Sequence, residues 1–440
     1  MAGPTAGNST AKAAEGQEQG TQTFAFIAMT CLFFFWGFIT VLNDILIPFL
    51  KESFDLNYTQ AMLVQFCFFG AYFIVSPFAG RLIDKVGYQQ GIVLGLLTTA
   101  AGCILFYPSA SFHVYGLFLF AFFVLASGIT ILQVAANPYV AALGPEKTAA
   151  SRLNLAQAAN SLGTTVGPII GAALILGVVA ADASAVQGPY LMIAGLLIAA
   201  ALVFRNIKLP KLAHVEATGE ESDGNIWEHR SLVLGALAIF LYVGGEVSIG
   251  SFLVNYFSES SIAGMSTADA GEMVAYYWGA AMIGRLVGAV LMNYVVATKY
   301  LAVNALIAII MIIVSMNSAG MVLEFGLPTI IINIALNFNI ALSETISLNV
   351  AMWSILAVGF FNSIMFPTIF TLAVKGLGSM TSKGSGFVCQ AIVGGALIPL
   401  VQGVAADSIG IQLSFIVPML CYIYIGWYAL NGAEVNAADS

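Results

Sequence analysis

The chain contains 440 residues, of which 60% are hydrophobic and 8% are charged. A water-soluble protein needs many more charged side chains to cover its surface, so this composition excludes a soluble enzyme or binding protein and indicates a membrane protein. The formal net charge of −8 at pH 7 also excludes a basic surface for nucleic acid.

Apolar runs recur along the whole chain after a polar stretch at residues 1–22, which we expect to be a disordered tail. Each run is long enough to cross about 30 Å of hydrocarbon as a helix. The sequence therefore predicts an all-α membrane protein with twelve transmembrane helices and a short tail at 433–440. The predicted spans are 24–50, 60–80, 89–107, 113–143, 155–181, 188–204, 231–258, 273–298, 300–318, 349–374, 384–406 and 408–431.

Basic residues gather in every second loop between these spans. Arg81 and Lys85 follow the second span, and Lys147 and Arg152 follow the fourth. The loops on the opposite side, as the predicted spans define them, contain Lys51 as their only Lys or Arg residue. Because short loops rich in Lys and Arg stay in the cytoplasm, we expect both termini on the cytoplasmic side of the membrane.

One long polar stretch, residues 207–230, divides the spans into two groups of six, and we interpret it as a cytoplasmic linker between bundles at 23–206 and 231–432. Each bundle contains the same local pattern of a proline, a short basic loop, a glutamine and a Gly-rich turn that ends in proline. Such repetition is typical of secondary transporters, which bind their substrate near the membrane midplane between the repeats. The residues of this pattern are Pro138, Gln157 and Pro168 in the first half, and Pro367, Gln390 and Pro399 in the second.

The loop after the second span carries a family motif. Gly80, Asp84, Lys85 and Gly87 match the G-x-x-x-D-[RK]-x-G loop of the major facilitator superfamily, although two glutamines replace its usual basic pair. Five longer segments resemble the bacterial fucose–galactose–glucose:cation symporter branch of that superfamily. They are "WGFITVLNDIL", "ANPYV", "SRLNLAQAANSLG", "YVGGEVSIGSFLVNY" and "FNSIMFPTIFTLAVKGLG". The resemblance implies two pseudo-symmetric six-helix halves, alternating access, a hexose of the glucose or galactose type as cargo, and a place in the bacterial inner membrane, where we expect a monomer.

Three ionised side chains lie well inside the predicted spans: Asp44, Glu246 and Arg285. A charge at the bilayer centre is costly unless it is paired or faces water, so each is a candidate functional residue. Glu246 and Arg285 lie on adjacent predicted helices and could approach one another. A structural ion pair and a role in gating or sugar contact are both compatible with this placement.

Asp44 has no obvious partner in its span. A carboxylate that is stable only when it binds a proton or a metal cation is how a symporter couples an ion to a solute. The alternative is that Asp44 lies at the outer interface near Lys51.

We predict that the coupled cation is sodium. The family resemblance implies a second acidic residue just before the Asn-Pro turn of the fourth span, but this chain has Gln133 there, which cannot titrate. Asn137 lies one helical turn further on the same face, and hard cations prefer such oxygen ligands. The predicted sodium site consists of Asp44, Asn43, Gln133, Asn137 and Thr40. Proton coupling through Asp44 alone is the alternative.

The fifth span carries a polar face. Asn154, Gln157, Ser161 and Thr164 recur at spacings of three, four and three, and Asn160 lies next to them. Asn and Gln both donate and accept hydrogen bonds, as a hydroxyl-rich ligand requires. Hydrogen bonding between membrane helices is the alternative use of these residues. The resemblance implies that Gln157 and Asn160 line a sugar site, and the other predicted sugar contacts are Asn154, Ser161, Glu246, Arg285, Asn362, Phe366 and Gln390.

Asp84 and Arg152 resemble the inner gate of the superfamily, in which an acidic side chain meets a helix N-terminus when the protein faces outward. Interactions of this kind are worth only about 0.3–1 kcal/mol when they are exposed. We therefore expect these two residues to bias a nearly balanced conformational equilibrium.

Residues 321–343 form an apolar stretch that has no counterpart in the resembling family. A span there would reverse the charge bias of every later loop, so we expect a periplasmic insertion that lies at the interface or folds back onto the bundle. The sequence contains no H-E-x-x-H, G-x-S-x-G or Walker-type motif. We therefore predict a transporter and not an enzyme, with no cofactor besides the co-transported ion.

Overall fold

The computed structural model describes residues 22–42, 50, 53–56, 58–171, 186–207, 209–210, 225–326, 330–334, 338–342 and 345–433. Asn43 and Asp44 lie outside the described residues, as do most of the two predicted tails and the centre of the predicted linker. Eleven of the described helices are long and apolar enough to cross a membrane. The helix α5 has 23 residues and completes the twelve; its polar face makes it less apolar than the others. The predicted twelve-helix bundle is therefore confirmed.

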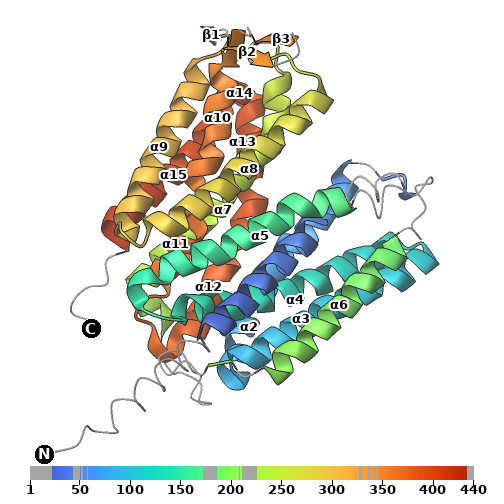
Figure 1. The fold of residues 1–440 in the computed structure, drawn as a ribbon. Coiled ribbons are helices and arrows are strands. Elements are labelled where there is room, and N and C mark those ends of the chain that lie inside the picture. The colour runs from blue at the N-terminus through green and yellow to red at the C-terminus, as the bar shows by residue number, and fades with distance from the viewer. Residues whose placement is uncertain are drawn as a thin grey trace, which may run out of the picture.

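In the described part of the first half, six long helices are found, and Figure 1 shows them lying together. Within it, α3 packs against α4 and α6, while α2 packs against α4. The helices are Gln22–Leu42, α2 (Tyr58–Val86), α3 (Tyr88–Phe112), α4 (Tyr115–Ala142), α5 (Ala149–Gly171) and α6 (Gln187–Asn206), with the short 3-10 helix η1 (Glu146–Thr148) before α5.

The short 3-10 helix η4 (Ile226–Glu228) lies in the predicted linker, and the second half, which begins with α7 (Arg230–Ser258), contains several broken helices. The tenth span, Val350–Ala373, consists of α10 (Val350–Asn362) and α11 (Met365–Ala373). The eleventh span is Gly378–Ile409 and the twelfth is Ile411–Gly432. Their parts are η5 (Gly378–Met380), α12 (Thr381–Gln390), η6 (Ala391–Val393), α13 (Gly394–Ile409), α14 (Ile411–Ser414), α15 (Ile416–Trp427) and η7 (Tyr428–Gly432), and the preceding spans are α7 (Arg230–Ser258), α8 (Thr267–Leu291) and α9 (Ala297–Asn317).

The two halves contact each other at the end of the bundle that carries the basic loops, which we call the predicted cytoplasmic end. There α5 packs along α8, and α12 packs along α2 and α4. Glycine permits the close approach of α2 and α12, because a Cβ added to Gly386 would lie 2.6 Å from the carbonyl oxygen of Ser76. Toward the opposite end the ribbons of the two halves diverge (Figure 1).

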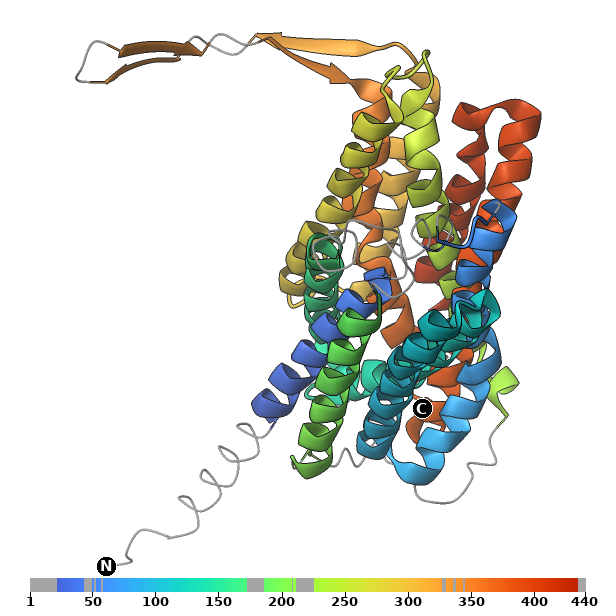
Figure 2. The ribbon, with the colours of Figure 1, turned by 90° about the vertical axis from the view of Figure 1, so that its right-hand side faces the viewer.

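The predicted insertion forms strands between α9 and α10. β1 (Val322–Gly326) pairs with β4 (Thr345–Asn349), and β2 (Ile330–Ile334) pairs with β3 (Phe338–Leu342), both antiparallel. They lie at the end of the bundle opposite the predicted cytoplasmic end and extend sideways, without folding back along the helices (Figure 2). The all-α prediction thus holds for the bundle but missed these strands. Their place relative to the membrane interface stays a prediction.

Candidate functional site

A buried ion pair lies where the halves meet. Arg285 of α8 approaches Glu246 of α7, with 3.6 Å between Nη2 and Oε1, and their side chains are only 13% and 12% exposed. The same guanidinium donates through Nη1 to the hydroxyl of Ser161 on α5. Arg285 therefore joins the second half to the first at about the middle of α5.

The orientation of Arg285 depends on a proline. Pro367 follows the break between α10 and α11 within the tenth span and has no N–H, so it cannot donate to the carbonyl of Ser363, four residues earlier, as a continuous helix would require. Arg285 Nε donates to that carbonyl oxygen at 3.1 Å. The break between α10 and α11 thus supplies an acceptor that holds the guanidinium in place.

Asn362 lies beside this pair, but its amide protons are used within the second half. The side chain is fully buried, and Nδ2 donates to the hydroxyl of Tyr277 at 2.7 Å and of Tyr422 at 3.0 Å. Tyr277 donates in turn to the carbonyl oxygen of Glu246 at 3.4 Å. Asn362, which we predicted to contact sugar, here connects α8, α10 and α15.

The predicted polar face of α5 lies against α8. Asn154, Gln157 and Ser161 are all buried. Asn154 Nδ2 donates to its own helix at Ala150 O over 2.9 Å and reaches Met292 Sδ across the halves at 3.2 Å. Since Gln157 lies between Asn154 and Ser161 on the same face, it is placed near the ion pair.

Asn160 points in another direction. Its Nδ2 donates to the carbonyl oxygen of Phe33 at 3.0 Å, which joins α5 to the helix Gln22–Leu42. A Cβ at Gly37 would lie 2.1 Å from the carbonyl oxygen of Asn160, so these two helices are in close contact. In this conformation Asn160 makes the helix–helix hydrogen bond that was the alternative to sugar binding.

The residues of the predicted sodium site are only partly described. Gln133 Nε2 donates to the hydroxyl of Tyr72 at 2.5 Å, and the hydroxyl of Thr40 donates to the carbonyl oxygen of Trp36 at 2.9 Å. Asn137 is fully buried, and neither of its amide atoms has a hydrogen-bond partner among the described residues. The carboxylate that would complete the site, Asp44, lies outside the described residues.

The two remaining predicted sugar contacts lie in different surroundings. Phe366 of α11 is buried and stacks on Phe370, with 6.1 Å between the ring centroids. Gln390, at the end of α12, donates from Nε2 to the carbonyl oxygen of Phe73 in α2 at 3.2 Å. Gln390 thus forms a contact between the halves.

The two predicted gate residues serve separate contacts. Asp84 is buried near the start of α12, where Tyr88 and Ser382 share a hydrogen bond of 3.2 Å between their hydroxyls. Arg152 donates to carbonyl oxygens at the end of α4 and the following loop, including Pro145 O at 2.9 Å. A guanidinium in this position also interacts favourably with the negative end of the α4 dipole.

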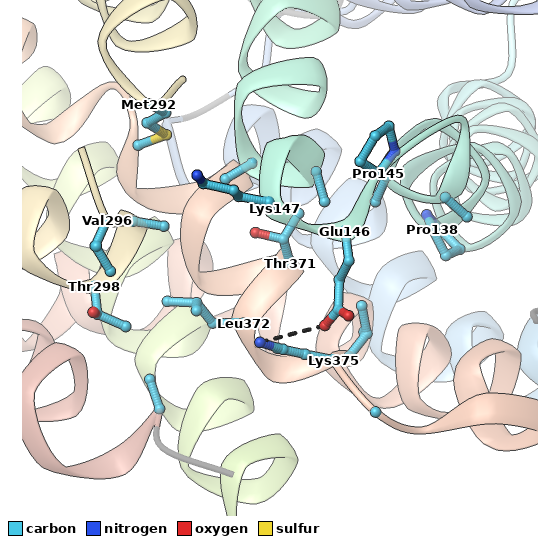
Figure 3. A pocket seen from close by; sticks show the side chains of 18 of the residues that line it. Pro138, Pro145, Glu146, Lys147, Met292, Val296, Thr298, Thr371, Leu372 and Lys375 are labelled. Carbon is cyan, nitrogen blue, oxygen red and sulfur yellow. Dashed lines mark ion pairs between the residues drawn. The ribbon is translucent and has the colours of Figure 1, made fainter. Parts of the chain in front are cut away.

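A cavity of about 1330 Å³ opens at the predicted cytoplasmic end between the two halves. Figure 3 shows Pro138, Pro145 and Glu146 on one side of the cavity and Met292 and Val296 on the other, with Lys375 beside Glu146. The Lys375 ammonium lies 3.3 Å from a Glu146 carboxylate oxygen, and these side chains are 49% and 69% exposed. We call Arg285 with its partners Glu246, Ser161 and Ser363 the Arg285 cluster. The α5–α8 contact lies between this cavity and the Arg285 cluster.

Residues 25–389 match the family model of the Major Facilitator Superfamily. The chain is 53% identical over 426 residues to the glucose/galactose transporter of Brucella abortus. This alignment covers 96% of this chain and 97% of the relative. It is 46% identical over 431 residues to the putative glucose/galactose transporter of Helicobacter pylori, with 94% and 98% covered. It is 32% identical over 436 residues to the L-fucose-proton symporter of Escherichia coli, with 92% of each covered.

Solved structures give the same result. The crystal structure of the E. coli fucose:proton symporter FucP aligns with a TM-score of 0.81 and 30% identity, covering 94% of this chain and 100% of that one. A structure of FucP in the outward conformation also aligns with a TM-score of 0.81. These relatives are transporters, which confirms the prediction that the protein is not an enzyme. The loop motif, the twelve-helix fold and the family model agree, and the chain belongs to the Major Facilitator Superfamily.

Proposed function

We propose that the protein imports a hexose of the glucose or galactose type together with sodium, by alternating access in a bacterial inner membrane with both termini in the cytoplasm. The observation that carries the proposal is the 53% identity, over 96% of this chain, to a relative named glucose/galactose transporter. Because the alignment spans 96% of this chain, it includes all the helices that could contribute to a substrate site.

The sugar would bind between the polar face of α5 and the Arg285 cluster. Gln157 supplies an amide that donates and accepts, and a guanidinium carries five N–H donors. The contacts of Arg285 with Ser161, Ser363 and Glu246 leave it further donor capacity for sugar hydroxyls. Both sides of this site are buried, so hydrogen bonds to a sugar would form away from bulk water.

The structure fits an outward-facing state in the proposed cycle. The contacts between the halves run from the Arg285 cluster to the predicted cytoplasmic end, where Glu146 meets Lys375. Inward opening would require the α5–α8 and α2–α12 contacts to separate.

Sodium is the proposed cation because Gln133 is a neutral oxygen ligand at the position where the family resemblance implies an acid. Proton coupling is the second candidate, and two observations favour it. A relative with 32% identity is named an L-fucose-proton symporter. The second half also holds a buried carboxylate, Glu246, that could exchange a proton.

The test is uptake of labelled glucose and galactose into proteoliposomes. We expect accumulation above equilibrium when a sodium gradient is imposed at equal pH on both sides, and none under a pH gradient without sodium. Accumulation driven by the pH gradient alone would replace sodium with proton coupling. Equilibration without accumulation under either gradient would identify a passive facilitator, and no uptake of any hexose would contradict the substrate class.

A further inference from the structure

Three helices at the contact between the halves contain a proline at a position that removes a backbone hydrogen bond. Pro77 lies inside α2 and Pro138 inside α4, and Pro367 lies inside the tenth span, just after the break between α10 and α11. Proline has no N–H, so the carbonyl four residues earlier loses its helical donor. The carbonyls concerned are those of Phe73, Val134 and Ser363.

Two of these carbonyls bind α12 across the halves. Gln390 Nε2 donates to Phe73 O at 3.2 Å. Ser385 Oγ donates to Val134 O at 2.9 Å, and both of those residues are fully buried. One helix of the second half therefore fills two acceptors that proline leaves open in two helices of the first half.

The third carbonyl follows the same pattern within the second half. Ser363 O accepts from Arg285 Nε, and the guanidinium then reaches Ser161 of the first half. In all three cases the acceptor that proline exposes takes part in the contact between the halves, directly or through Arg285. A side-chain bond to a released carbonyl is thus a shared feature of this interface.

We infer that Pro77 and Pro138 are positioning residues of the transport cycle, because each exposes a carbonyl to which α12 binds when the predicted cytoplasmic end is closed. The inference rests on the proposed alternating access. It assigns these prolines a role in the equilibrium between closed and open states, beyond bending their helices.

The chemistry of the Ser385–Val134 bond suits a contact that must break and form again. In the closed state both groups are buried, so the carbonyl depends on the serine for its partner. When the halves separate, water can reach the carbonyl of Val134, and the Ser385 hydroxyl can turn to the carbonyl one turn back on its own helix. Both groups thus have replacement partners in the open state, and the bond favours closure only modestly.

The experiment measures how often the predicted cytoplasmic end opens, without any sugar. Ser151, which is buried and donates to the carbonyl oxygen of Ala289 across the halves, is replaced by cysteine after the five native cysteines are removed. The labelling rate of Cys at 151 by a water-soluble maleimide, in purified protein in lipid nanodiscs, then reports the open population. Pro138→Ala and Ser385→Ala should each raise this rate about threefold to tenfold, as expected for one lost hydrogen bond.

The decisive comparison is the double variant. Because both substitutions remove the same bond, Pro138→Ala with Ser385→Ala should label no faster than either single variant. Pro108→Ala in α3 is the matched control, because α3 packs within the first half, and it should leave the rate unchanged. Additive effects, an unchanged rate in Ser385→Ala, or an equal effect of Pro108→Ala would each overturn the inference. The readout needs neither sugar nor sodium, so a failure of the proposed substrate would not be mistaken for a failure here.

Discussion

Two of the ion pairs among the described residues lie where the halves meet, and their surroundings differ. The exposed pair, Glu146 with Lys375, has the shorter separation of 3.3 Å. The buried pair, Glu246 with Arg285, is 3.6 Å apart, and its guanidinium also binds Ser161 across the halves. Water and salt screen the exposed pair, so it is worth less than about 1 kcal/mol. Burial, and not distance, decides which contact matters more.

Removal of Arg285 should have the largest effect of any change that tests this comparison. Arg285→Met leaves Glu246 buried without its cation, which costs about 3–5 kcal/mol in measured cases. We expect a clear loss of thermal stability in detergent and loss of sugar uptake. The two measurements together separate the structural role of the pair from its role in transport.

The matched control is the double variant Arg285→Met with Glu246→Gln. It removes both charges, so thermal stability should recover most of the loss while uptake stays absent. Recovery of uptake as well would mean that neither charge contacts the sugar. Full stability of Arg285→Met alone would contradict the unfavourable burial of an unpaired carboxylate.

The next largest effect concerns the polar face of α5. We expect Gln157→Ala to lower sugar uptake at least tenfold without unfolding the protein, because the amide would be a direct ligand of the sugar. Asn160→Ala breaks the bond to Phe33 and should cost about 0.5–1.5 kcal/mol in stability, and its uptake should fall only if Asn160 also reaches the sugar, as the family resemblance implies. Leu155→Ala, an exposed position on the same helix, is the control and should transport normally. Normal uptake by both Gln157→Ala and Asn160→Ala would remove the proposed sugar site.

The sequence predicted the helical spans and the neighbourhood of the buried ion pair because both follow from hydropathy. A charge inside an apolar run needs a partner, and Glu246 and Arg285 were the two charges on adjacent spans. Periodicity likewise placed Asn154, Gln157 and Ser161 on one face of α5. The helical spans and the polar face of α5 each depend on the hydropathy or periodicity of a single short segment, so both could be predicted from the sequence.

The partners of individual amides were not predictable in this way. The amide of Asn362 donates to a tyrosine hydroxyl, and the amide of Asn160 donates to a backbone carbonyl, each on a neighbouring helix. Which acceptor an amide reaches depends on how the helices are rotated and packed. The sequence could have indicated that the carbonyl of Ser363 has no backbone donor, because Pro367, four residues later, has no N–H. The side-chain donor to that carbonyl, Arg285, lies far away along the chain and required the structure.

The smallest effect should come from the exposed pair. Glu146→Gln removes one charge from a contact that solvent already screens, so the labelling rate at position 151 should rise less than about fivefold at low salt. At about 1 M salt the Debye length falls to about 3 Å, and the difference from the parent protein should disappear. Lys375→Gln should behave in the same way, because either change removes the same interaction. A large effect that persists at high salt would mean that Glu146 and Lys375 act through a buried contact, and the distinction between the two regions would then be wrong.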